Sequence, residues 1–404
     1  MNIEKISLIG LGKLGLPLLC TFANSGQKIL GIDIDREKID NLRKKILPFY
    51  EPQLREYLNS GFKNIQVVSN CNDVIEDTDV AIILVNTPSR EDGEFSNEYI
   101  YDAVGALAQS LKFSTKEDFL FVISSTVMPQ SHKTIIKKIE DISGRKLNNG
   151  FGVTYVPDLV ALGTVIKDFE NPDVLIIGES EKRYGDIAES FYKKIIKNNA
   201  PVVRMSLVEG EMTKVSLNAY VTMKISFANF IGNITDKLKC NHSNITKALG
   251  YDKRISPHFI KSGLAFGGTC FPRDTWAFIK LSENLGLDAL HIKATQRINE
   301  LQNELLFEKV KGYKDKTIGI VGLSFKPDTI VVDESPGQIL FDKLNSNSYN
   351  VRAFDSLVLN STDLQDFINN VDVVVITHND KKLISSVRLD DKIIVDNWGV
   401  SHSR

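Results

Sequence analysis

The chain has 404 residues, of which 42% are hydrophobic and 25% are charged, a composition typical of a globular protein with a substantial core. Its 49 lysine and arginine residues nearly balance 51 aspartate and glutamate residues, so the net charge of −2 gives no sign of a surface for nucleic acid or anionic membrane. Four widely spaced cysteines and six scattered histidines suggest neither a disulfide framework nor a metal site.

The start of the chain reads as the first strand of a domain. An apolar run is followed at once by glycines, without the basic stretch and small-residue cleavage site of a secretory leader. No uncharged stretch approaches the roughly 18 residues that a membrane-spanning helix needs. We therefore expect a cytoplasmic protein that does not bind membranes.

The pattern along the chain predicts three regions. Short apolar runs alternate with amphipathic stretches up to residue 205, which is typical of βαβ units and a parallel sheet. Residues 206–310 show helical periodicity instead, including one helix of about thirty residues, longer than the usual range. The α/β pattern returns in residues 311–404. The predicted fold class is α/β, with two Rossmann-like doubly wound parallel-sheet domains joined by a helical central domain.

A dinucleotide-binding fingerprint opens the first region. Gly10, Gly12 and Gly15 follow a strand and begin a helix, and Asp33 ends the next strand about twenty residues further on. The glycines permit a tight turn, close approach of a pyrophosphate, and helix–sheet packing in that order. Because Asp33 would bond the ribose hydroxyls and repel a 2′-phosphate, we expect NAD rather than NADP, although Arg36 lies close by in sequence.

The third region echoes the first without the full fingerprint. Gly319 and Gly322 follow its first strand, but Phe325, Lys326 and Pro327 stand where a third glycine would be expected. Such a domain can still bind a nucleotide at the carboxyl ends of its strands. This implies a second ligand different from NAD.

Two features of the central region can support chemistry. Cys270 lies in the segment SGLAFGGTCFPRD, where Gly267 and Gly268 allow a ligand to approach the backbone and Asp274 follows four residues later. A cysteine there can act as a nucleophile, or it can simply be buried in a tight turn. Lys214 and Asn218 are spaced to share one face of the long helix, where they form either a pair of donors for an oxyanion or a solvated surface.

Together these residues resemble the UDP-glucose/GDP-mannose dehydrogenase family of nucleotide-sugar dehydrogenases, over nearly the whole chain. The shared motifs are the glycine-rich start, a Thr-Pro loop at Thr87, an STV-P segment at Thr126, the Lys-xxx-Asn helix, the cysteine loop up to Asp274, and an FKP motif at Lys326. The resemblance implies three domains in the order given above: NAD binding in 1–205, a central domain in 206–310 and nucleotide-sugar binding in 311–404.

The resemblance also implies a mechanism. Two NAD+ would oxidise the C6 alcohol of a nucleotide sugar, most simply a UDP-sugar, to a uronic acid through a thiohemiacetal and a thioester on Cys270. Lys214 and Asn218 would hold the C6 oxygen, and Asp274 and Thr126 would position water or transfer protons. Thr87 and Thr126 would line the cofactor pocket, and Gly267 and Lys326 would contact the substrate. Polysaccharide biosynthesis is the natural destination of such uronic acids.

The chain departs from the family pattern in places. The glutamate that serves the family as a candidate base for thioester hydrolysis is replaced by Asp158, and a second glutamate by Leu162. Asn397 and Trp398 replace a region that usually contains arginine, which leaves the identity of the sugar and of the nucleotide open.

Two other readings compete with this one. A single-step β-hydroxyacid dehydrogenase also carries a Lys-xxx-Asn pair, but it needs neither the cysteine loop nor the second Rossmann-like domain. A nucleotide-sugar binder without turnover is suggested by Asp158 and Leu162, although the other candidate catalytic residues are all present. By resemblance we also expect a homodimer formed through the long central helix.

Overall fold

A computed structural model describes residues 5–71 and 74–401, and the chain divides into two compact units, Met1–Val215 and Ser216–Arg404. We call them the N-terminal unit and the C-terminal unit. The finer division into three domains stays a prediction. Residues 1–4, on which part of the expectation about a leader rests, lie outside the described residues. Within the described ranges, no helix combines the length and the apolar character needed to span a membrane.

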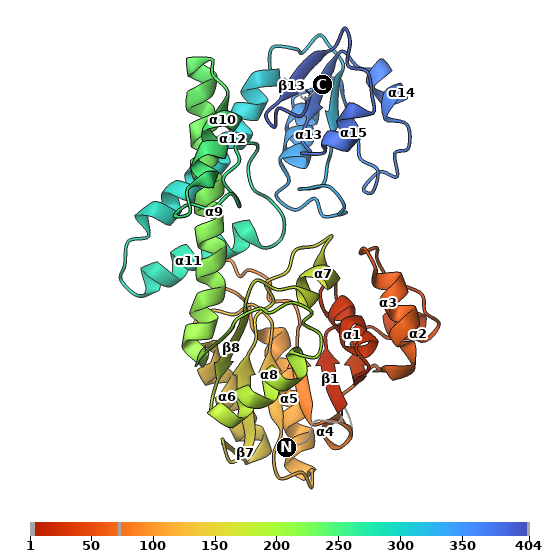
Figure 1. Ribbon diagram of the computed structural model, residues 1–404, viewed down its shortest axis with the longest axis vertical. Helices are drawn as coiled ribbons and strands as arrows, with labels where there is room; N and C mark the ends of the chain where they lie inside the picture. The colour runs from red at the N-terminus through yellow and green to blue at the C-terminus, as the bar shows by residue number, and fades with distance from the viewer. Residues whose placement is uncertain (1–4, 72–73, 402–404) are drawn as a thin grey trace. The chain divides into compact units, whose positions relative to one another are not determined.

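The N-terminal unit is a sheet with helices on both faces, as the alternating pattern predicted (Figure 1). Its strands are β1 (Lys5–Ile9), β2 (Lys28–Ile32), β3 (Ile65–Val68), β4 (Val80–Ile83), β5 (Leu120–Ile123), β6 (Lys146–Leu147), β7 (Gly150–Tyr155), β8 (Leu175–Glu179) and β9 (Val202–Ser206). Its helices are α1 (Gly15–Asn24), α2 (Arg36–Arg43), α3 (Leu54–Gly61), α4 (Val74–Asp77), α5 (Glu98–Phe113), α6 (Ser131–Ser143), α7 (Val165–Glu170) and α8 (Lys182–Tyr192), with a 3-10 turn at Phe62–Asn64.

The strand order is β3-β2-β1-β4-β5-β7-β8-β9, with β6 paired to β7. The order reverses direction between β1 and β4, so the carboxyl ends of these two strands form the switch point where ligands bind in such sheets. One pair departs from the parallel pattern, because β7 and β8 are antiparallel. The connection between them, residues 156–174, contains only the six-residue helix α7.

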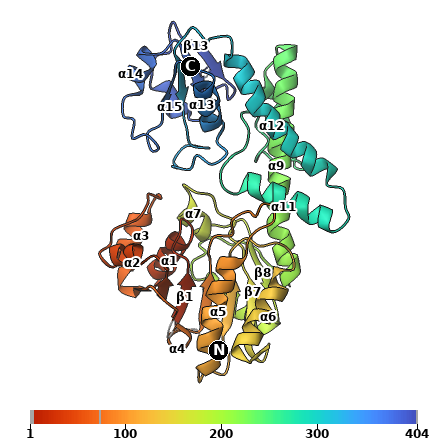
Figure 2. The same cartoon turned by 180° about the vertical axis from the view of Figure 1, so that it is seen from behind.

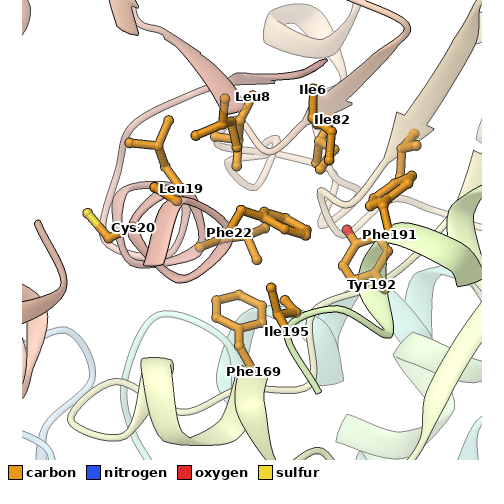
Figure 3. Packing of buried hydrophobic residues seen from close by; sticks show 14 of the residues in the cluster. Ile6, Leu8, Leu19, Cys20, Phe22, Ile82, Phe169, Phe191, Tyr192 and Ile195 are labelled. Carbon is orange, nitrogen blue, oxygen red and sulfur yellow. The ribbon is translucent and has the colours of Figure 1, made fainter. Parts of the chain in front are cut away.

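Alternate residues of each central strand face opposite sides of the sheet. Leu8 of β1 and Ile82 of β4 belong to the core under α1 and α8, while Ile9 and Ile83 belong to the core under α5 and α6. Figure 2 shows α5 and α6 side by side on their face. On the other face, Phe22 of α1 packs against the aromatic rings that end α8 (Figure 3). Burial on both faces explains why these strands read as continuous apolar runs.

The C-terminal unit combines long helices with a smaller parallel sheet of order β11-β10-β12-β13. Both units contribute residues to α9 (Leu207–Leu238), the helix of about thirty residues that the periodicity predicted. The other elements are α10 (His242–Tyr251), α11 (Phe271–Asn284), α12 (Leu290–Val310), β10 (Ile318–Val321), α13 (Pro336–Ser346), β11 (Val351–Phe354), α14 (Leu364–Asn369), β12 (Val373–Ile376), α15 (Lys381–Ser385) and β13 (Ile393–Asp396). Leu306 and Val310 of α12 share one core with β10 and β12, which joins the helices to the sheet.

Candidate active site

The glycine-rich turn between β1 and α1 is built as the fingerprint requires. Gly10 has φ +97°, and a Cβ there would collide with the carbonyl oxygen of Leu84. A Cβ on Gly15 would collide with the carbonyl oxygen of Gly10, so this third glycine lets α1 pack against the turn. Beside Gly12 there is open space, with no atom within 4 Å of a Cβ position. The open position lies at the helix N-terminus, which suits a pyrophosphate.

Asp33 follows β2 and is held beside this turn. Its Oδ2 accepts a hydrogen bond from the backbone N–H of Leu11 at 2.9 Å and forms an ion pair with Lys38 Nζ at 2.8 Å. Its Oδ1 accepts from the backbone N–H of Asp35 at 3.0 Å. The carboxylate is therefore fixed at the place where Rossmann folds that bind dinucleotides hold the adenine ribose.

Thr87 and Thr126 come together at the carboxyl ends of β4 and β5. The Thr87 hydroxyl is buried and donates to the carbonyl oxygen of Thr126 at 2.8 Å. The neighbouring Ser125 hydroxyl accepts from Val85 N at 2.9 Å and donates to Val85 O at 2.8 Å. These bonds join two loops that sequence reasoning placed at the cofactor, and both loops adjoin the switch point.

Asp158 lies in the loop after β7 and is the most perturbed carboxyl group of the N-terminal unit. Burial raises its pKa to about 7, and the Lys214 ammonium offsets only part of that rise. Its Oδ2 is buried and accepts no hydrogen bond from any described residue. The ammonium of Lys214 donates instead to the carbonyl oxygen of Asp158 at 2.6 Å. Two predicted site residues thus meet, and one carboxyl oxygen remains available to a ligand or water.

Two buried glutamates hold the surrounding loops, and sequence reasoning did not find either. Glu51 accepts from the backbone N–H groups of Gly163 and Val165 at 3.0 and 2.9 Å, so it caps α7 and closes the loop that carries Asp158. Glu211 accepts from Gln130 N and His132 N at 2.7 and 2.8 Å, so it caps α6 just after the segment of Thr126. No sequence signal could have found them, because each glutamate is far along the chain from the helix whose N-terminus it caps.

In the C-terminal unit, Cys270 is exposed at the position immediately before α11. The loop that precedes it packs tightly. A Cβ on Gly267 would collide with the carbonyl oxygen of Glu334, and one on Gly268 would lie about 3 Å from the Phe325 ring. The backbone N–H of Gly268 also donates to Asp333 O at 2.8 Å. The cysteine is therefore presented at a helix N-terminus by a loop with little freedom.

Asp274 lies one turn into α11 and is fully buried. Its Oδ2 accepts from Asn218 Nδ2 at 2.5 Å, and its Oδ1 accepts from Arg273 Nε at 2.9 Å and is paired with Arg273 Nη2 at 2.8 Å. The structure thus brings Asn218 and Asp274 together, as their roles required. It also shows that Arg273 is the counter-ion of Asp274. The position of this basic residue directly before Asp274 in the sequence could have suggested the pair.

The sheet of the C-terminal unit repeats the frame of the N-terminal one. Gly322 has φ +108°, and a Cβ on Gly337 would collide with the Gly322 carbonyl oxygen, as Gly15 would with Gly10. The fingerprint spacing is therefore absent, as the sequence indicated, but a packing glycine is supplied by Gly337 of α13, after an extended loop that contains Lys326. Burial alone would raise the pKa of Asp355, but backbone N–H donors, including those of Val358 and Leu323, lower it.

The predicted site residues fall in two groups. The N-terminal unit contains Gly10, Gly12, Gly15, Asp33, Thr87, Thr126, Asp158 and Lys214, and the C-terminal unit contains Asn218, Gly267, Cys270, Asp274 and Lys326. A glycine turn with a fixed acid after the second strand, at the switch point of a Rossmann sheet, defines a dinucleotide-dependent enzyme of the dehydrogenase class.

Comparison with known proteins gives the family. Residues 4–196 match the NAD binding domain, and residues 208–301 the central domain, of the UDP-glucose/GDP-mannose dehydrogenase family. The chain belongs to this family of NAD-dependent nucleotide-sugar 6-dehydrogenases, which confirms the resemblance seen in the sequence and NAD as cofactor.

Individual relatives carry different substrate names. The chain is 31% identical to a UDP-glucose 6-dehydrogenase of Rickettsia bellii over 88% of this chain and 82% of the relative. It is 29% identical to a GDP-mannose 6-dehydrogenase of Pseudomonas putida over 94% of this chain and 92% of the relative. Among solved structures it is similar to a UDP-glucose dehydrogenase from Pyrobaculum islandicum, with a TM-score of 0.93 and 27% identity over 99% of this chain and 96% of the other.

Proposed function

We propose that the protein oxidises the C6 primary alcohol of a UDP-sugar to the carboxylate, with two NAD+ and with Cys270 as covalent nucleophile. The observation that carries the proposal is the start of α11. Cys270 is exposed there, while Asp274 one turn later is buried and bonded to Asn218. Burying the Asp274 carboxyl group costs free energy, and packing alone does not require a carboxyl group at this position. We therefore assign the arrangement to function.

The proposed reaction has four steps. The C6 alcohol first loses a hydride and a proton and becomes an aldehyde. The Cys270 sulfur then adds to the aldehyde carbon while its proton passes to the oxygen. The thiohemiacetal next loses a second hydride from carbon and the proton of its hydroxyl group, and becomes a thioester. Water finally cleaves the carbon–sulfur bond, releasing the carboxylate and the thiol. When bound, each NAD+ accepts one of the two hydrides.

Each residue of the two groups has a role in these steps. Lys214 and Asn218 stabilise the C6 oxygen as negative charge develops on it. Asp274 orients the amide of Asn218, because both its carboxyl oxygens already accept bonds within the C-terminal unit. Cys270 stands immediately before α11, where the positive end of the helix dipole favours a thiolate.

Asp158 is the proposed base for thioester hydrolysis. Its pKa of about 7 lets it accept a proton from water near neutral pH, and Oδ2 accepts no hydrogen bond from the described residues. It replaces the longer glutamate of the family. Thr126 would help to position the water and, with Thr87, line the cofactor pocket, since the two are bonded at the end of the sheet.

NAD fits the residues of the N-terminal unit. The open space beside Gly12 would admit a pyrophosphate, and the fixed Asp33 carboxylate would bind the ribose hydroxyls and disfavour a 2′-phosphate. In the C-terminal unit, Gly267 and Lys326 are assigned to the substrate. A UDP-sugar is favoured by the Pyrobaculum islandicum structure, whereas several relatives are named for GDP-mannose, so the nucleotide needs a direct test.

The test is to incubate the protein with NAD+ and UDP-glucose, UDP-N-acetylmannosamine, GDP-mannose, and CDP- and dTDP-sugars, and to count NADH per sugar consumed. We expect two NADH and one carboxylate with a UDP-sugar, and loss of the second NADH in Cys270→Ser. One NADH per sugar, unaffected by that substitution, would overturn the role of Cys270 and favour a single-step dehydrogenase. No NADH with any sugar would favour a binder without turnover.

We also propose that two copies of the chain associate through α9. Large apolar side chains that are 38–69% exposed recur on one face of the helix within the C-terminal unit: Leu217, Tyr220, Phe227, Phe230, Ile234 and Leu238. A stripe of this kind on a long helix suits a helix–helix interface. Light scattering should give the mass of two chains, and Phe227→Glu with Phe230→Glu should give one. A single-chain mass for the parent at all concentrations would refute the dimer.

A further inference from the structure

The segment that leads into the cysteine loop is buried but forms neither helix nor strand. Ile260, Leu264 and Phe266 are each less than 7% exposed, between the end of α10 and the start of α11. A buried backbone without a helix or a sheet must find other partners for its N–H and C=O groups. In this protein two asparagine side chains supply them.

Asn229 of α9 makes the first of these contacts. Its Oδ1 accepts from Gly263 N and its Nδ2 donates to Leu264 O, both at 2.8 Å. The side chain is 1% exposed, so both bonds are shielded from water. The side-chain amide of Asn229 thus bonds the N–H of one residue and the C=O of the next.

Asn299 of α12 makes the second contact two residues further along. Its Oδ1 accepts from Phe266 N at 2.7 Å and its Nδ2 donates to Phe266 O at 3.0 Å. This is the exchange that a neighbouring strand makes in an antiparallel pair, here made by one buried side chain. Since α9 and α12 supply one asparagine each, the segment is held from two helices.

These bonds fix the backbone up to four residues before Cys270. Beyond Phe266, the backbone of Gly268 is bonded to Asp333 and packs against the Phe325 ring. The position of the sulfur is therefore set by a chain of contacts that starts at the two asparagines. A sulfur displaced by about 1 Å can lower the rate of a bond-forming step by about two orders of magnitude.

We propose that Asn229 and Asn299 are positioning residues that fix Cys270 for capture of the aldehyde. This inference rests on the proposed function, in which Cys270 adds to the aldehyde made in the first oxidation. Loss of either asparagine leaves that first oxidation in place and slows the addition of sulfur. The aldehyde is then released before it is captured.

The decisive measurement is the amount of aldehyde trapped by a hydroxylamine reagent per NADH formed, with the sugar nucleotide that gives the most NADH in the panel. We expect Asn229→Ala and Asn299→Ala each to raise the trapped fraction about ten-fold, with the double variant raising it by less than the product, because both act on one segment. Loss of folded protein alone would lower NADH formation and leave the trapped fraction unchanged.

Gln302→Ala is the matched control. Gln302 is 2% exposed on α12, one turn after Asn299, and its Nε2 donates to no described residue. Removing it deletes a buried amide of the same helix whose nitrogen makes no hydrogen bond to the loop. An equal rise of trapped aldehyde in this control would overturn the proposal.

Hydrogen exchange provides a test that does not depend on chemistry. In the parent, the amides of Gly263 and Phe266 should exchange slowly, and each asparagine variant should lose protection at its own partner. The Ser variants at both positions replace the Ala variants if these do not fold. Fast exchange of both amides in the parent would overturn the proposal.

The outcomes separate this inference from the proposed function. Two NADH per sugar in Cys270→Ser would sink the proposed function, and the positioning role with it. Aldehyde release in Cys270→Ser but parent-like release in both asparagine variants would overturn the positioning role alone.

Discussion

Replacing Asp158 with asparagine should stabilise the protein at alkaline pH while it blocks turnover. The native state holds the Asp158 proton more tightly than the unfolded chain, because burial raises its pKa from 3.8 to about 7. Stability from this group is therefore present below pH 3.8 and is lost as the pH rises towards 7. The whole shift corresponds to about 4 kcal/mol, at about 1.4 kcal/mol per pH unit.

The difference between two pH values gives a sharper number than the absolute stability. At pH 5.5 the buried Asp158 carboxyl is neutral like an amide, and at pH 8.5 it is ionised. The pKa of about 7 lies about 1.5 units above pH 5.5, and each unit corresponds to about 1.4 kcal/mol of stability that the parent loses by pH 8.5. The stability gained from Asp158→Asn should therefore be about 2 kcal/mol larger at pH 8.5 than at pH 5.5. For a unit of this size this is about 4–8 °C in Tm, measured by thermal unfolding of parent and variant side by side. A gain that does not change with pH would refute the raised pKa.

The same variant tests the role of Asp158 in hydrolysis. If Asp158 activates water, Asp158→Asn should form two NADH per active site in a rapid burst and then stop, with the acyl group on Cys270 visible as a mass increase. Asp158→Glu, the family residue, is the control and should restore turnover. Steady carboxylate formation by Asp158→Asn at the parent rate would show that the thioester is hydrolysed without this carboxyl group.

Three further predictions follow from the contacts. Gly12→Ala should leave the melting temperature unchanged but weaken NAD+ binding by tenfold or more in a titration, whereas Gly15→Ala should unfold the N-terminal unit, because only the second Cβ collides with backbone. Glu51→Ala should cost about 1–2 kcal/mol in denaturant unfolding through loss of the α7 cap, and parent-like stability would contradict that role. In mass-spectrometric alkylation at pH 8, exposed Cys270 should react within minutes and Cys20, whose pKa burial raises to about 12, only after unfolding.

Local spacing predicted those parts of the site that lie within one βα turn. The roles of Gly10, Gly12 and Gly15 follow from their spacing after a strand, and the structure gives each glycine the surroundings that its role requires. The fold class was predictable for the same reason, because strands buried on both faces must be apolar throughout. The antiparallel pairing of β7 with β8 was not predictable, because an apolar run does not show the direction in which its strand pairs.

Contacts between residues far apart in the sequence could not be predicted. Glu211 caps a helix that begins 80 residues earlier, at Ser131, and nothing in its local sequence indicates this partner. The expected role of Asp274 in positioning water or transferring protons stays a prediction, and the structure adds that its two carboxyl oxygens are bonded to Asn218 and Arg273. The sequence contained these residues, and only the fold shows which of their atoms are engaged.

The extended loop between Gly322 and Gly337 explains how one fold serves two purposes in this chain. In the N-terminal unit the turn glycine and the packing glycine are separated by residues 11–14, so the helix N-terminus stays open for a pyrophosphate. In the C-terminal unit they are separated by residues 323–336, and this insertion contacts Gly267 and Gly268 of the cysteine loop. The same frame is kept, since Gly337 still packs on Gly322, but the βα loop now supports the loop that carries Cys270. Because function resides in such loops rather than in the sheet, the second Rossmann-like sheet could lose its dinucleotide turn without losing its fold.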